Sequence, residues 1–361
     1  MGRVLILTNS SGGLYDFRNE FVKALTEEHQ VFISMPDDTK RKELEAEGCR
    51  IIQTAINRRG INPLEDLKLY RTYSKMMKEL KPDLVATYTI KPNIYGGFAA
   101  RCHKVPYIET ITGLGGAFDR TGLFLKLIVT MYRMGLKKAE CIFFQNQENR
   151  GIFERLGITA KKTRMVMGSG VNLERHKEEP YPKSDETHFL FVGRVMKERG
   201  ILEFLEAARR LHTDKVHFDI LGYCDEDYQQ MLDELEKEGV IRQLGFHTEV
   251  HPYLTAANAI VIASFHEGMS NALIEAAATG RPVIASSISG CMEAFEEGKT
   301  GFGFTPGNAE ELIEAMQKFL NLTTEERAVM GHHAREKMEK EFDRKLVTGA
   351  YMDEVHQILS R

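Results

Sequence analysis

Short apolar segments alternate with helical segments along almost the whole chain, and this alternation is the feature that most constrains the fold. Helical periodicity fills most of the intervals, as in 17–28 and 201–211. Near-continuous apolar strands joined by helices predict parallel sheets that are covered on both faces, which is the doubly wound α/β class. The segments with a strand pattern are 3–8, 30–34, 83–88, 106–111, 141–145, 164–168, 188–193, 216–222, 241–246, 259–264 and 281–286.

The length of the chain predicts two domains. Single hydrophobic cores stop growing at roughly 250–300 residues, and the chain has 361. The strand series is interrupted at 176–187, a charged stretch with two prolines that is typical of a linker. We therefore predict one domain over 1–175 and a second over 176–341. A final amphipathic helix, at about 342–361, could pack on either of them.

Composition excludes several classes of protein. No apolar run approaches the 18 or more residues of a spanning helix, and the start lacks the pattern of a signal peptide or a myristoylation site. Five scattered cysteines favour reduced cytosolic thiols over a disulfide framework or a zinc site. Residues 1–175 carry 28 Lys and Arg against 19 Asp and Glu, while the remainder carries 20 against 33. The first half therefore either meets an anionic partner or merely has an uneven surface charge.

Two glutamates, Glu267 and Glu275, stand eight residues apart in FHEGMSNALIEAAATG. The same spacing recurs in other pairs that we interpret as solvated surface residues: Glu20/Glu28, Glu140/Glu148, Glu198/Glu206 and Glu226/Glu234. This pair differs because it follows the buried strand 259–264, and ligands of parallel α/β domains bind at the carboxyl ends of strands. The position therefore favours a ligand site over a solvated helix.

A short helix is predicted immediately after the first of these glutamates. Ser270 is a good N-cap for a helix over about 271–279, and Gly280 is a good C-cap. The amides near Met269 to Leu273 would then form an anion site at the helix start. Because a carboxylate repels an anion, we expect Glu275 to accept hydrogen bonds from a ribose and Glu267 from a second sugar. Such a ligand is a sugar nucleotide.

A diphosphate also requires cations, and the loop after strand 188–193 supplies Arg194, Lys197 and Arg199. Arginine can hold phosphate oxygens bidentately and could stabilise a leaving diphosphate without a metal. The alternative is a solvated basic turn. Asp225 and Asp227 have the Asp-x-Asp spacing of divalent-metal sites, but we interpret them as charges at the start of an acidic helix.

The first half offers three further strand exits with polar or glycine-rich loops. Gly12 and Gly13 lie between a strand and a helix, 110–118 contains a second glycine cluster, and Lys91 follows a third strand. Each could be ordinary turn chemistry, but together they favour a polar cleft. The segment 122–138 is apolar with spaced basic residues, so it is either a core helix or a monotopic membrane contact.

These residues resemble the family 4 retaining glycosyltransferases, which have the GT-B fold of two Rossmann-like domains facing across a cleft. In the second half the matching stretches are FVGRVMKERGILEFL, LGYCDED, LGFHTEV and ASFHEGMSNALIEAAATGRPVIASSISGCMEAFEEGKTGF. In the first half LILTNSSGGLYDFRNEF, YTIKPNIYGG, ETITGLGGAFDRTGL, FFQNQEN and GSGVNLERH resemble the capsule, exopolysaccharide and lipid-linked oligosaccharide branch.

The resemblance implies roles for individual residues. Arg194, Arg199 and Glu267 would be catalytic, with Arg199 standing where the family usually has lysine. Arg18, Lys91 and Thr112 would lie on the acceptor side, and Thr112 replaces a histidine that is frequent there. The last helix would cross back onto the first domain. Donor contacts would come from Gly12, Gly13, Phe246, Gly268, Met269, Ser270, Asn271 and Glu275, with Phe246 beside the base.

The resemblance implies transfer of a hexose or N-acetylhexosamine, with retention of configuration, from a UDP-sugar to a polyprenyl-diphosphate-linked saccharide. Neither metal nor cofactor is expected, nor is a nucleic-acid partner. The expected location is the cytoplasm, peripheral at the inner face of the cell membrane, with contact to anionic lipid. A GT-B sugar-nucleotide epimerase and a non-catalytic partner that binds sugar nucleotide remain as alternatives.

Overall fold

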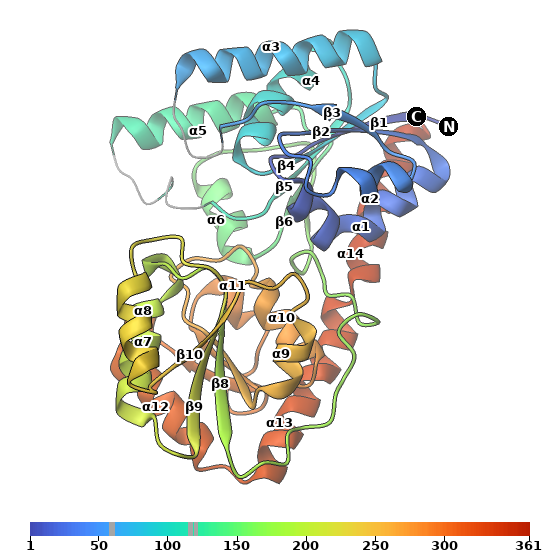
Figure 1. Ribbon diagram of the computed structural model, residues 1–361. Helices are drawn as coiled ribbons and strands as arrows, with labels where there is room; N and C mark the ends of the chain where they lie inside the picture. The colour runs from blue at the N-terminus through green and yellow to red at the C-terminus, as the bar shows by residue number, and fades with distance from the viewer. Residues whose placement is uncertain (58–61, 115–117, 119–121) are drawn as a thin grey trace. The chain divides into compact units, whose positions relative to one another are not determined.

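The computed structural model describes residues 1–57, 62–114, 118 and 122–361. The chain forms two compact units, the first comprising Met1–Ser169 with Arg344–Arg361 and the second Gly170–Asp343. Each unit is built on one parallel sheet with helices packed against it (Figure 1). The predicted doubly wound α/β class is confirmed.

The sheet of the first unit has the strand order β3-β2-β1-β4-β5-β6-β7. The sequence pattern did not predict β3, a short edge strand without a continuous apolar run. The strands are β1 (Arg3–Leu7), β2 (Gln30–Met35), β3 (Arg50–Gln53), β4 (Leu84–Tyr88), β5 (Tyr107–Ile111), β6 (Cys141–Phe144) and β7 (Thr163–Met165). The helices are α1 (Ser11–Glu28), α2 (Arg41–Ala46), α3 (Pro63–Leu80), α4 (Gly97–His103), α5 (Leu123–Leu136), α6 (Gln147–Arg155) and α14 (Arg344–Leu359), with a π-helical turn at Pro92–Gly96.

Side-chain alternation along β1 shows how this sheet buries both faces. Val4 and Ile6 join one apolar cluster, which contains side chains of α1 and α14, and Leu5 and Leu7 join another with α3 and α5. Successive side chains of a strand point to opposite faces, so a strand covered on both sides must be apolar throughout. This explains why the central strands read as continuous apolar runs.

The second unit has a six-stranded sheet of order β10-β9-β8-β11-β12-β13. Its edge strand β13, with the sequence GFGF, was also not predicted. The strands are β8 (Thr187–Val192), β9 (Val216–Leu221), β10 (Arg242–Gly245), β11 (Ala259–Ile262), β12 (Val283–Ser286) and β13 (Gly301–Phe304). The helices are α7 (Ile201–Leu211), α8 (Gln229–Lys237), α9 (His251–Ala256), α10 (Asn271–Ala278), α11 (Ser289–Met292), α12 (Ala309–Leu320) and α13 (Thr324–Lys337), with a 3-10 turn at Lys197–Arg199 and a π-helical turn at Met338–Phe342.

The boundary between the units lies between Ser169 and Gly170, whereas the sequence analysis placed it at 175/176. The segment that the sequence analysis interpreted as a linker, 176–187, is tied to the second unit by buried arginines. Arg281, which is fully buried, donates to the carbonyl oxygens of Glu179 and Pro180 at 2.9 and 2.8 Å. Arg335 donates to the His176 carbonyl at 2.7 Å. Charged donors to backbone carbonyls hold this irregular stretch in place.

Glu109, in the middle of β5, is a fully buried carboxyl group whose two oxygens have no hydrogen-bond partner in the described ranges of the chain. Its side chain faces helix α4, where a Cβ on Gly97 would lie only 2.1 Å from Glu109 Oε1. Burial raises the pKa of Glu109 well above its ordinary value of 4.5, because the charged form loses its hydration. Folding therefore favours the protonated form of this carboxyl.

We predict that Glu109→Gln stabilises the protein by an amount that grows as the pH rises. The proton on Glu109 stabilises the fold below the ordinary pKa of 4.5, and this contribution is lost as the pH rises toward the raised folded pKa. The loss is at most about 1.4 kcal/mol per pH unit. Glutamine keeps the shape without ionising, so its advantage in urea unfolding free energy should be larger at pH 8 than at pH 5. An equal difference at both pH values would contradict this.

Candidate functional site

The carboxyl ends of β8 and β11, neighbours in the sheet of the second unit, bring two predicted residues into contact. Arg199, in the 3-10 turn after β8, forms an ion pair with Glu267, in the loop after β11. The hydroxyl of Ser264 links them, since it accepts from Arg199 Nη1 at 3.2 Å and donates to Glu267 Oε1 at 3.0 Å. Ser264 was not predicted as a site residue, although it is the last residue of the predicted strand 259–264.

The second predicted arginine, Arg194, is paired with a carboxylate that the sequence analysis interpreted differently. Arg194 Nη1 donates to Asp225 Oδ2 at 2.6 Å, and the Asp225 amide donates to the Val195 carbonyl at 3.1 Å. The interpretation of Asp225 as a helix-start charge is wrong, because α8 begins only at Gln229. The loop after β9 instead lies against the loop after β8 and orients its arginine.

The two arginines form a cationic pair that is only half exposed. Burial, together with the nearby charge of Arg194, lowers the pKa of Arg199 from its ordinary value of 12.5. The side chains of Arg194 and Arg199 are 36% and 31% exposed. Within the described parts of the chain, the Nη2 and Nε groups of both donate no hydrogen bond. These remaining N–H groups are suited to an anion.

The predicted helix start at Ser270 is present, but part of its predicted anion site is already occupied. Ser270 Oγ accepts from the Leu273 amide at 3.4 Å, which confirms it as the N-cap of α10. The Ser270 amide donates to the Gly290 carbonyl at 3.0 Å. The expectation of free backbone amides is therefore wrong for Ser270 and Leu273. The Leu273 amide is bonded to the N-cap side chain, and the Ser270 amide is bonded to the neighbouring loop. Gly268, Met269 and Asn271 flank Ser270 at the same helix start.

Glu275 lies one turn further along α10, beside a histidine that the sequence analysis missed. Its side chain is 15% exposed, and its carboxylate lies 3.9 Å from His176 Nε2. His176 is buried and makes an edge contact with the His251 ring, at 5.6 Å between ring centroids. Nothing in the sequence indicated this neighbour, because His176 belongs to the stretch interpreted as a linker. The Glu275 side chain is therefore partly exposed, with His176 against one side of its carboxylate.

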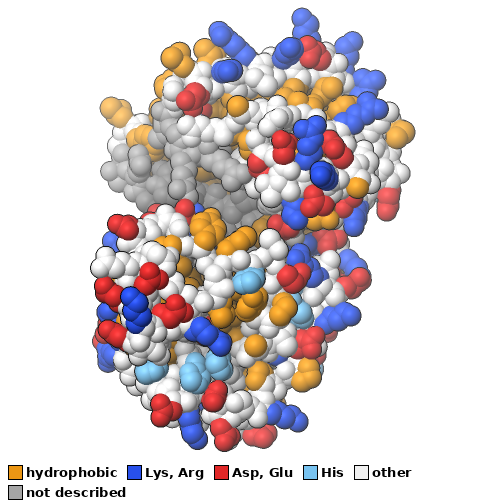
Figure 2. Space-filling model, viewed as in Figure 1, with side chains coloured by type: hydrophobic (Ala, Val, Ile, Leu, Met, Phe, Trp, Pro, Cys, Tyr) orange, Lys and Arg blue, Asp and Glu red, His pale blue; other side chains and the backbone are white. Residues whose placement is uncertain are grey.

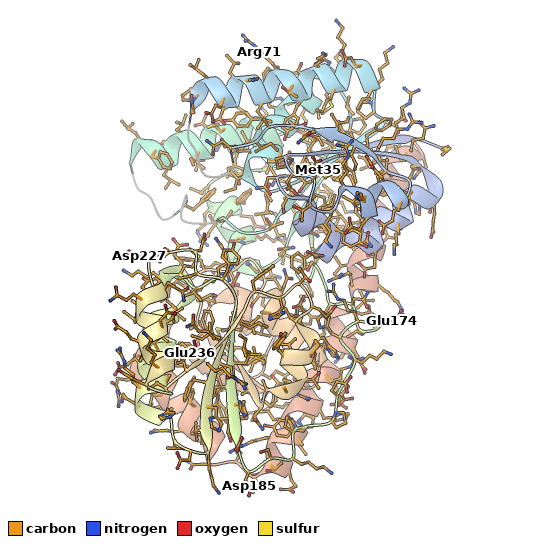
Figure 3. The ribbon with its side chains drawn as sticks, viewed as in Figure 1. Met35, Arg71, Glu174, Asp185, Asp227 and Glu236 are labelled. Atoms are coloured by element: carbon orange, nitrogen blue, oxygen red, sulfur yellow. The ribbon has the colours of Figure 1, made fainter. Side chains whose placement is uncertain are left out.

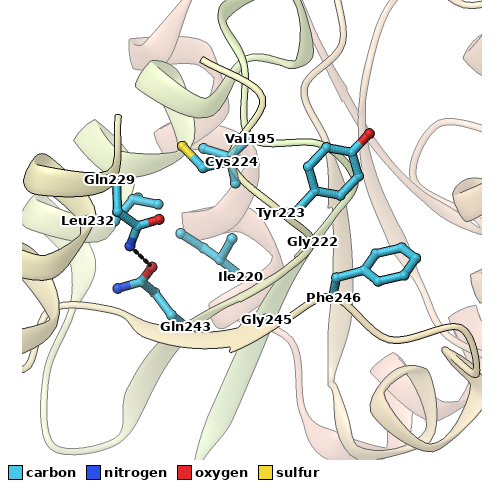
Figure 4. Close-up of a pocket in the computed structure, with 10 residues that line it drawn as sticks. All are labelled: Val195, Ile220, Gly222, Tyr223, Cys224, Gln229, Leu232, Gln243, Gly245 and Phe246. Atoms are coloured by element: carbon cyan, nitrogen blue, oxygen red, sulfur yellow. Dashed lines mark hydrogen bonds between the residues drawn. The ribbon is translucent and has the colours of Figure 1, made fainter. Parts of the chain in front are cut away.

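A pocket of about 320 Å³ lies where β8, β9 and β10 end (Figure 4). Two aromatic rings, Tyr223 and Phe246, stand at 5.8 Å and 75° to one another at its edge, and Phe246 is 63% exposed. Gln229 donates to Gln243 at 3.0 Å within it. Aromatic faces and amide groups together suit a flat, polar ring such as a base. The lining residues are Val195, Ile220, Gly222, Tyr223, Cys224, Gln229, Leu232, Gln243, Gly245 and Phe246.

In the first unit, Gly12 and Gly13 lie inside a helix rather than in a loop. Helix α1 begins at Ser11, and the Gly13 amide donates to Ser10 Oγ at 3.1 Å. The Ser11 amide donates to Asp37 Oδ2 at 3.1 Å. A carboxylate and a cap hydroxyl thus already satisfy two donors of this helix start. The predicted glycine loop is therefore wrong in conformation, because the N-cap lies two residues earlier than Gly12.

The acceptor-side residues have different surroundings. Lys91 pairs with Asp66 at 2.7 Å and is largely buried, so its ammonium group is engaged in the fold. Arg18 is 8% exposed, and its guanidinium carbon lies 4.5 Å from the centre of the Tyr88 ring. Thr112 follows the end of β5 and is half-buried. Of the predicted glycine-rich exit 110–118, residues 115–117 lie outside the described parts of the chain.

One residue that the sequence analysis did not predict as a site residue, Thr89, lies at the carboxyl end of β4. Thr89 follows β4 with φ at 74°, and its buried hydroxyl finds no hydrogen-bond partner within 1–57, 62–114, 118 and 122–361. Positive φ is uncommon for a β-branched residue and costs on the order of 1–3 kcal/mol. Strain of this kind is concentrated at ligand-binding sites, so Thr89 joins the candidates on the first unit.

Two doubly wound α/β units, one of them with paired arginines and carboxylates at its strand ends, are the architecture of the GT-B fold. Two family models match the chain: glycosyl transferases group 1 over residues 186–322 and glycosyl transferase 4-like over residues 3–146. The chain belongs to this glycosyltransferase family.

Curated relatives agree with this assignment. The N,N'-diacetylbacillosaminyl-diphospho-undecaprenol alpha-1,3-N-acetylgalactosaminyltransferase of Campylobacter jejuni is 27% identical over 336 residues, covering 88% of this chain and 89% of the relative. The UDP-Gal:alpha-D-GlcNAc-diphosphoundecaprenol alpha-1,3-galactosyltransferase of Escherichia coli is 30% identical over 257 residues, covering 64% and 65%. Among solved structures, HepE of Anabaena in complex with UDP-glucose has a TM-score of 0.80 at 18% identity and covers 100% of both chains.

We predict that Gly290→Ala disturbs the loop that carries Glu267. An added Cβ would lie 2.5 Å from the Glu267 carbonyl oxygen, a separation that forces the backbone to move. We expect a loss of stability of about 1–3 kcal/mol and a loss of transfer rate on the order of 100-fold for a displacement of ~1 Å. The measurements are urea unfolding and initial rates of donor consumption.

Gly349→Ala, in α14, is the matched control. No atom lies within 4 Å of its added Cβ, and alanine is the better helix former. We expect unchanged rates and equal or slightly higher stability. Equal rates in the Gly290 and Gly349 variants would contradict the link between Gly290 and the site.

Proposed function

We propose that this glycosyltransferase is a retaining, metal-independent hexosyltransferase that uses a nucleotide-diphosphate sugar. The observation that carries the proposal is the arrangement of Arg194 and Arg199 in the loop after β8, each held by a carboxylate from the loop after a neighbouring strand. Fixed guanidinium groups with unused N–H donors suit a diphosphate leaving group. The solved complexes of HepE with UDP and UDP-glucose support UDP as the nucleotide.

The donor is proposed to bind along the strand ends of the second unit. The base stacks at Phe246 and Tyr223, and the Glu275 carboxylate accepts hydrogen bonds from the ribose diol. The diphosphate binds between the arginines and the start of α10, where the helix dipole favours negative charge. Glu267, already fixed by Arg199 and Ser264, accepts from hydroxyls of the transferred sugar.

The proposed reaction breaks the bond between the anomeric carbon and the diphosphate oxygen. The electron pair leaves with the nucleoside diphosphate, whose added charge Arg194 and Arg199 stabilise. The acceptor hydroxyl forms the new bond on the same face of the sugar, and its proton passes to the departing phosphate oxygen. Configuration at the anomeric carbon is then retained.

Arginine variants test this assignment. Arg194→Ala is expected to lower transfer at least about 100-fold by removing stabilisation of the leaving group, while the urea midpoint stays close to wild type. Arg199→Lys keeps the charge and should retain activity within about 10-fold, whereas Arg199→Met should lose at least about 100-fold. Unchanged turnover in Arg194→Ala would sink the assignment. Activity that persists in EDTA would support independence from metal.

The products formed from sugar nucleotides distinguish this proposal from the epimerase and from the non-catalytic partner. The purified chain is incubated with a panel of UDP- and GDP-sugars without acceptor, and the products are resolved by anion-exchange chromatography. Slow hydrolysis of one donor supports a glycosyltransferase, whereas interconversion of sugars would indicate an epimerase. Binding without any turnover would indicate a non-catalytic partner.

We further propose that the acceptor is a polyprenyl-diphosphate-linked saccharide, as the names of both bacterial relatives state for those enzymes. Such an acceptor requires contact with a membrane surface at the inner face of the cell membrane. No described helix has both the length and the apolar character to cross a bilayer. Peripheral contact is therefore the proposed mode.

Helix α5 has the surface that such contact needs. Leu123, Leu127 and Met134 are 85%, 54% and 44% exposed, and the exposed Lys126 and Arg133 lie among them. Figure 2 shows separate hydrophobic side chains on the surface of the first unit. Exposed leucines beside basic residues favour the interface of an anionic membrane.

We predict that Leu123→Ser with Leu127→Ser weakens binding to vesicles of phosphatidylglycerol by about 10-fold or more, because the apolar contribution to membrane binding is lost. Co-sedimentation measures the bound fraction. Leu346→Ser is the control, since Leu346 is 55% exposed on a different helix. An equal loss in both variants, or no binding by wild type, would contradict membrane contact through α5.

A further inference from the structure

Three metal-ligating side chains gather at the amino ends of β8 and β9, far along the strands from the arginine site. They are Glu186, His188 and His217, and their ligand atoms all lie within 4.8 Å of one another. Among the residues of the second unit that Figure 3 labels, Asp185 is next to this cluster in sequence and Asp227 is in the loop after β9. The two lie at opposite ends of the unit. The cluster is separate from the proposed donor site.

The sheet itself places the two histidines together. His188 and His217 are direct partners in the parallel register of β8 and β9, so both side chains project from the same face. Their rings stack at 4.7 Å and 28°. Two protonated imidazoles at this distance would repel one another, whereas two neutral rings can share a cation.

The free nitrogen atoms point to Glu186 without bonding to it. His188 Nε2 and His217 Nε2 lie 3.7 and 3.6 Å from Glu186 Oε2, beyond hydrogen-bond range. His217 Nε2 is buried and has no hydrogen-bond partner among the residues that the structure describes. Ligands bound tetrahedrally at about 2.1 Å are about 3.4 Å apart, so the two nitrogen–oxygen separations exceed this value by only a few tenths of an ångström.

A second layer of contacts fixes one of these histidines. His188 Nδ1 lies 3.0 Å from Asp219 Oδ2, and Asp219 is held at 2.8 and 2.9 Å by Arg242. A carboxylate on Nδ1 fixes the tautomer whose Nε2 carries the lone pair, which is the arrangement behind most metal-bound histidines. The side chains of His188 and His217 are 23% and 32% exposed, so a metal ion can reach both from solvent.

The geometry points to a divalent transition-metal site, formed by Glu186, His188 and His217, that binds Zn²⁺ with water completing the coordination. Two imidazoles and one carboxylate are a ligand set that zinc prefers. Because the cluster lies at the amino ends of the strands, the metal joins β8, β9 and the preceding segment rather than taking part in transfer. The inference does not depend on the proposed function.

The test uses the full chain after chelation and dialysis, titrated with ZnCl₂ by calorimetry and with Co²⁺ by visible absorption. We expect one Zn²⁺ to bind per chain and the midpoint temperature of thermal unfolding to rise with Zn²⁺. The visible absorption band of bound Co²⁺ should be typical of a low coordination number. His217→Ala and Glu186→Gln should each weaken binding at least about 10-fold, and Asp219→Asn about 10–100-fold through His188.

His332→Ala is the matched control. His332 is an exposed histidine with its own carboxylate neighbours, Glu178 at 2.8 Å and Glu336 at 3.8 Å. Wild-type affinity in this variant supports the assignment to the strand pair. Equal affinity in wild type and His217→Ala, loss of binding only in His332→Ala, or no binding by wild type would overturn it.

Discussion

The contact of Arg199 with Ser264 and Glu267 is the interaction on which the arrangement of the site depends. It joins the loop after β8 to the loop after β11. Without this contact, each loop would hold a partly buried charge, Arg199 or Glu267, with no partner to compensate it. Removing such charges from water is costly unless they are paired and hydrogen-bonded. The bridging hydroxyl supplies the additional bond, so both loops hold one position and the start of α10 is fixed beside them.

Buried or partly buried arginines that fix irregular segments recur throughout the second unit. Arg281 is fully buried and donates to five backbone carbonyls, including Thr255 and Thr279. Arg335 and Arg327 likewise donate to carbonyls, at the ends of α10 and α12 respectively. Arginine suits this task because its planar fork presents several donors and stays charged. Segments without regular structure thereby gain the order that a ligand site on loops requires.

Much of the fold could be predicted because its signals are local. Central strands buried on both faces must be apolar throughout, and α10 carries its own N-cap at Ser270 and a left-handed glycine at Gly280, with φ at 77°. The edge strands β3 and β13 escaped prediction because an edge strand is less buried and needs no continuous apolar run. Gly12 and Gly13 were misplaced because Ser10, rather than a residue after them, caps α1.

The sequence by itself determined the fold class, the elements with strong periodicity and the identity of Arg199 and Glu267 as candidates. Only the tertiary structure decided their partners. The pairing of Arg194 with Asp225 and the stacking of two histidines depend on which strands are neighbours and in which register. The pairing of Glu275 with His176 depends on the segment after Gly170 packing against α10. Side chains meet across a parallel sheet through crossover connections of many residues, so their contacts leave no spacing in the sequence from which they could be read.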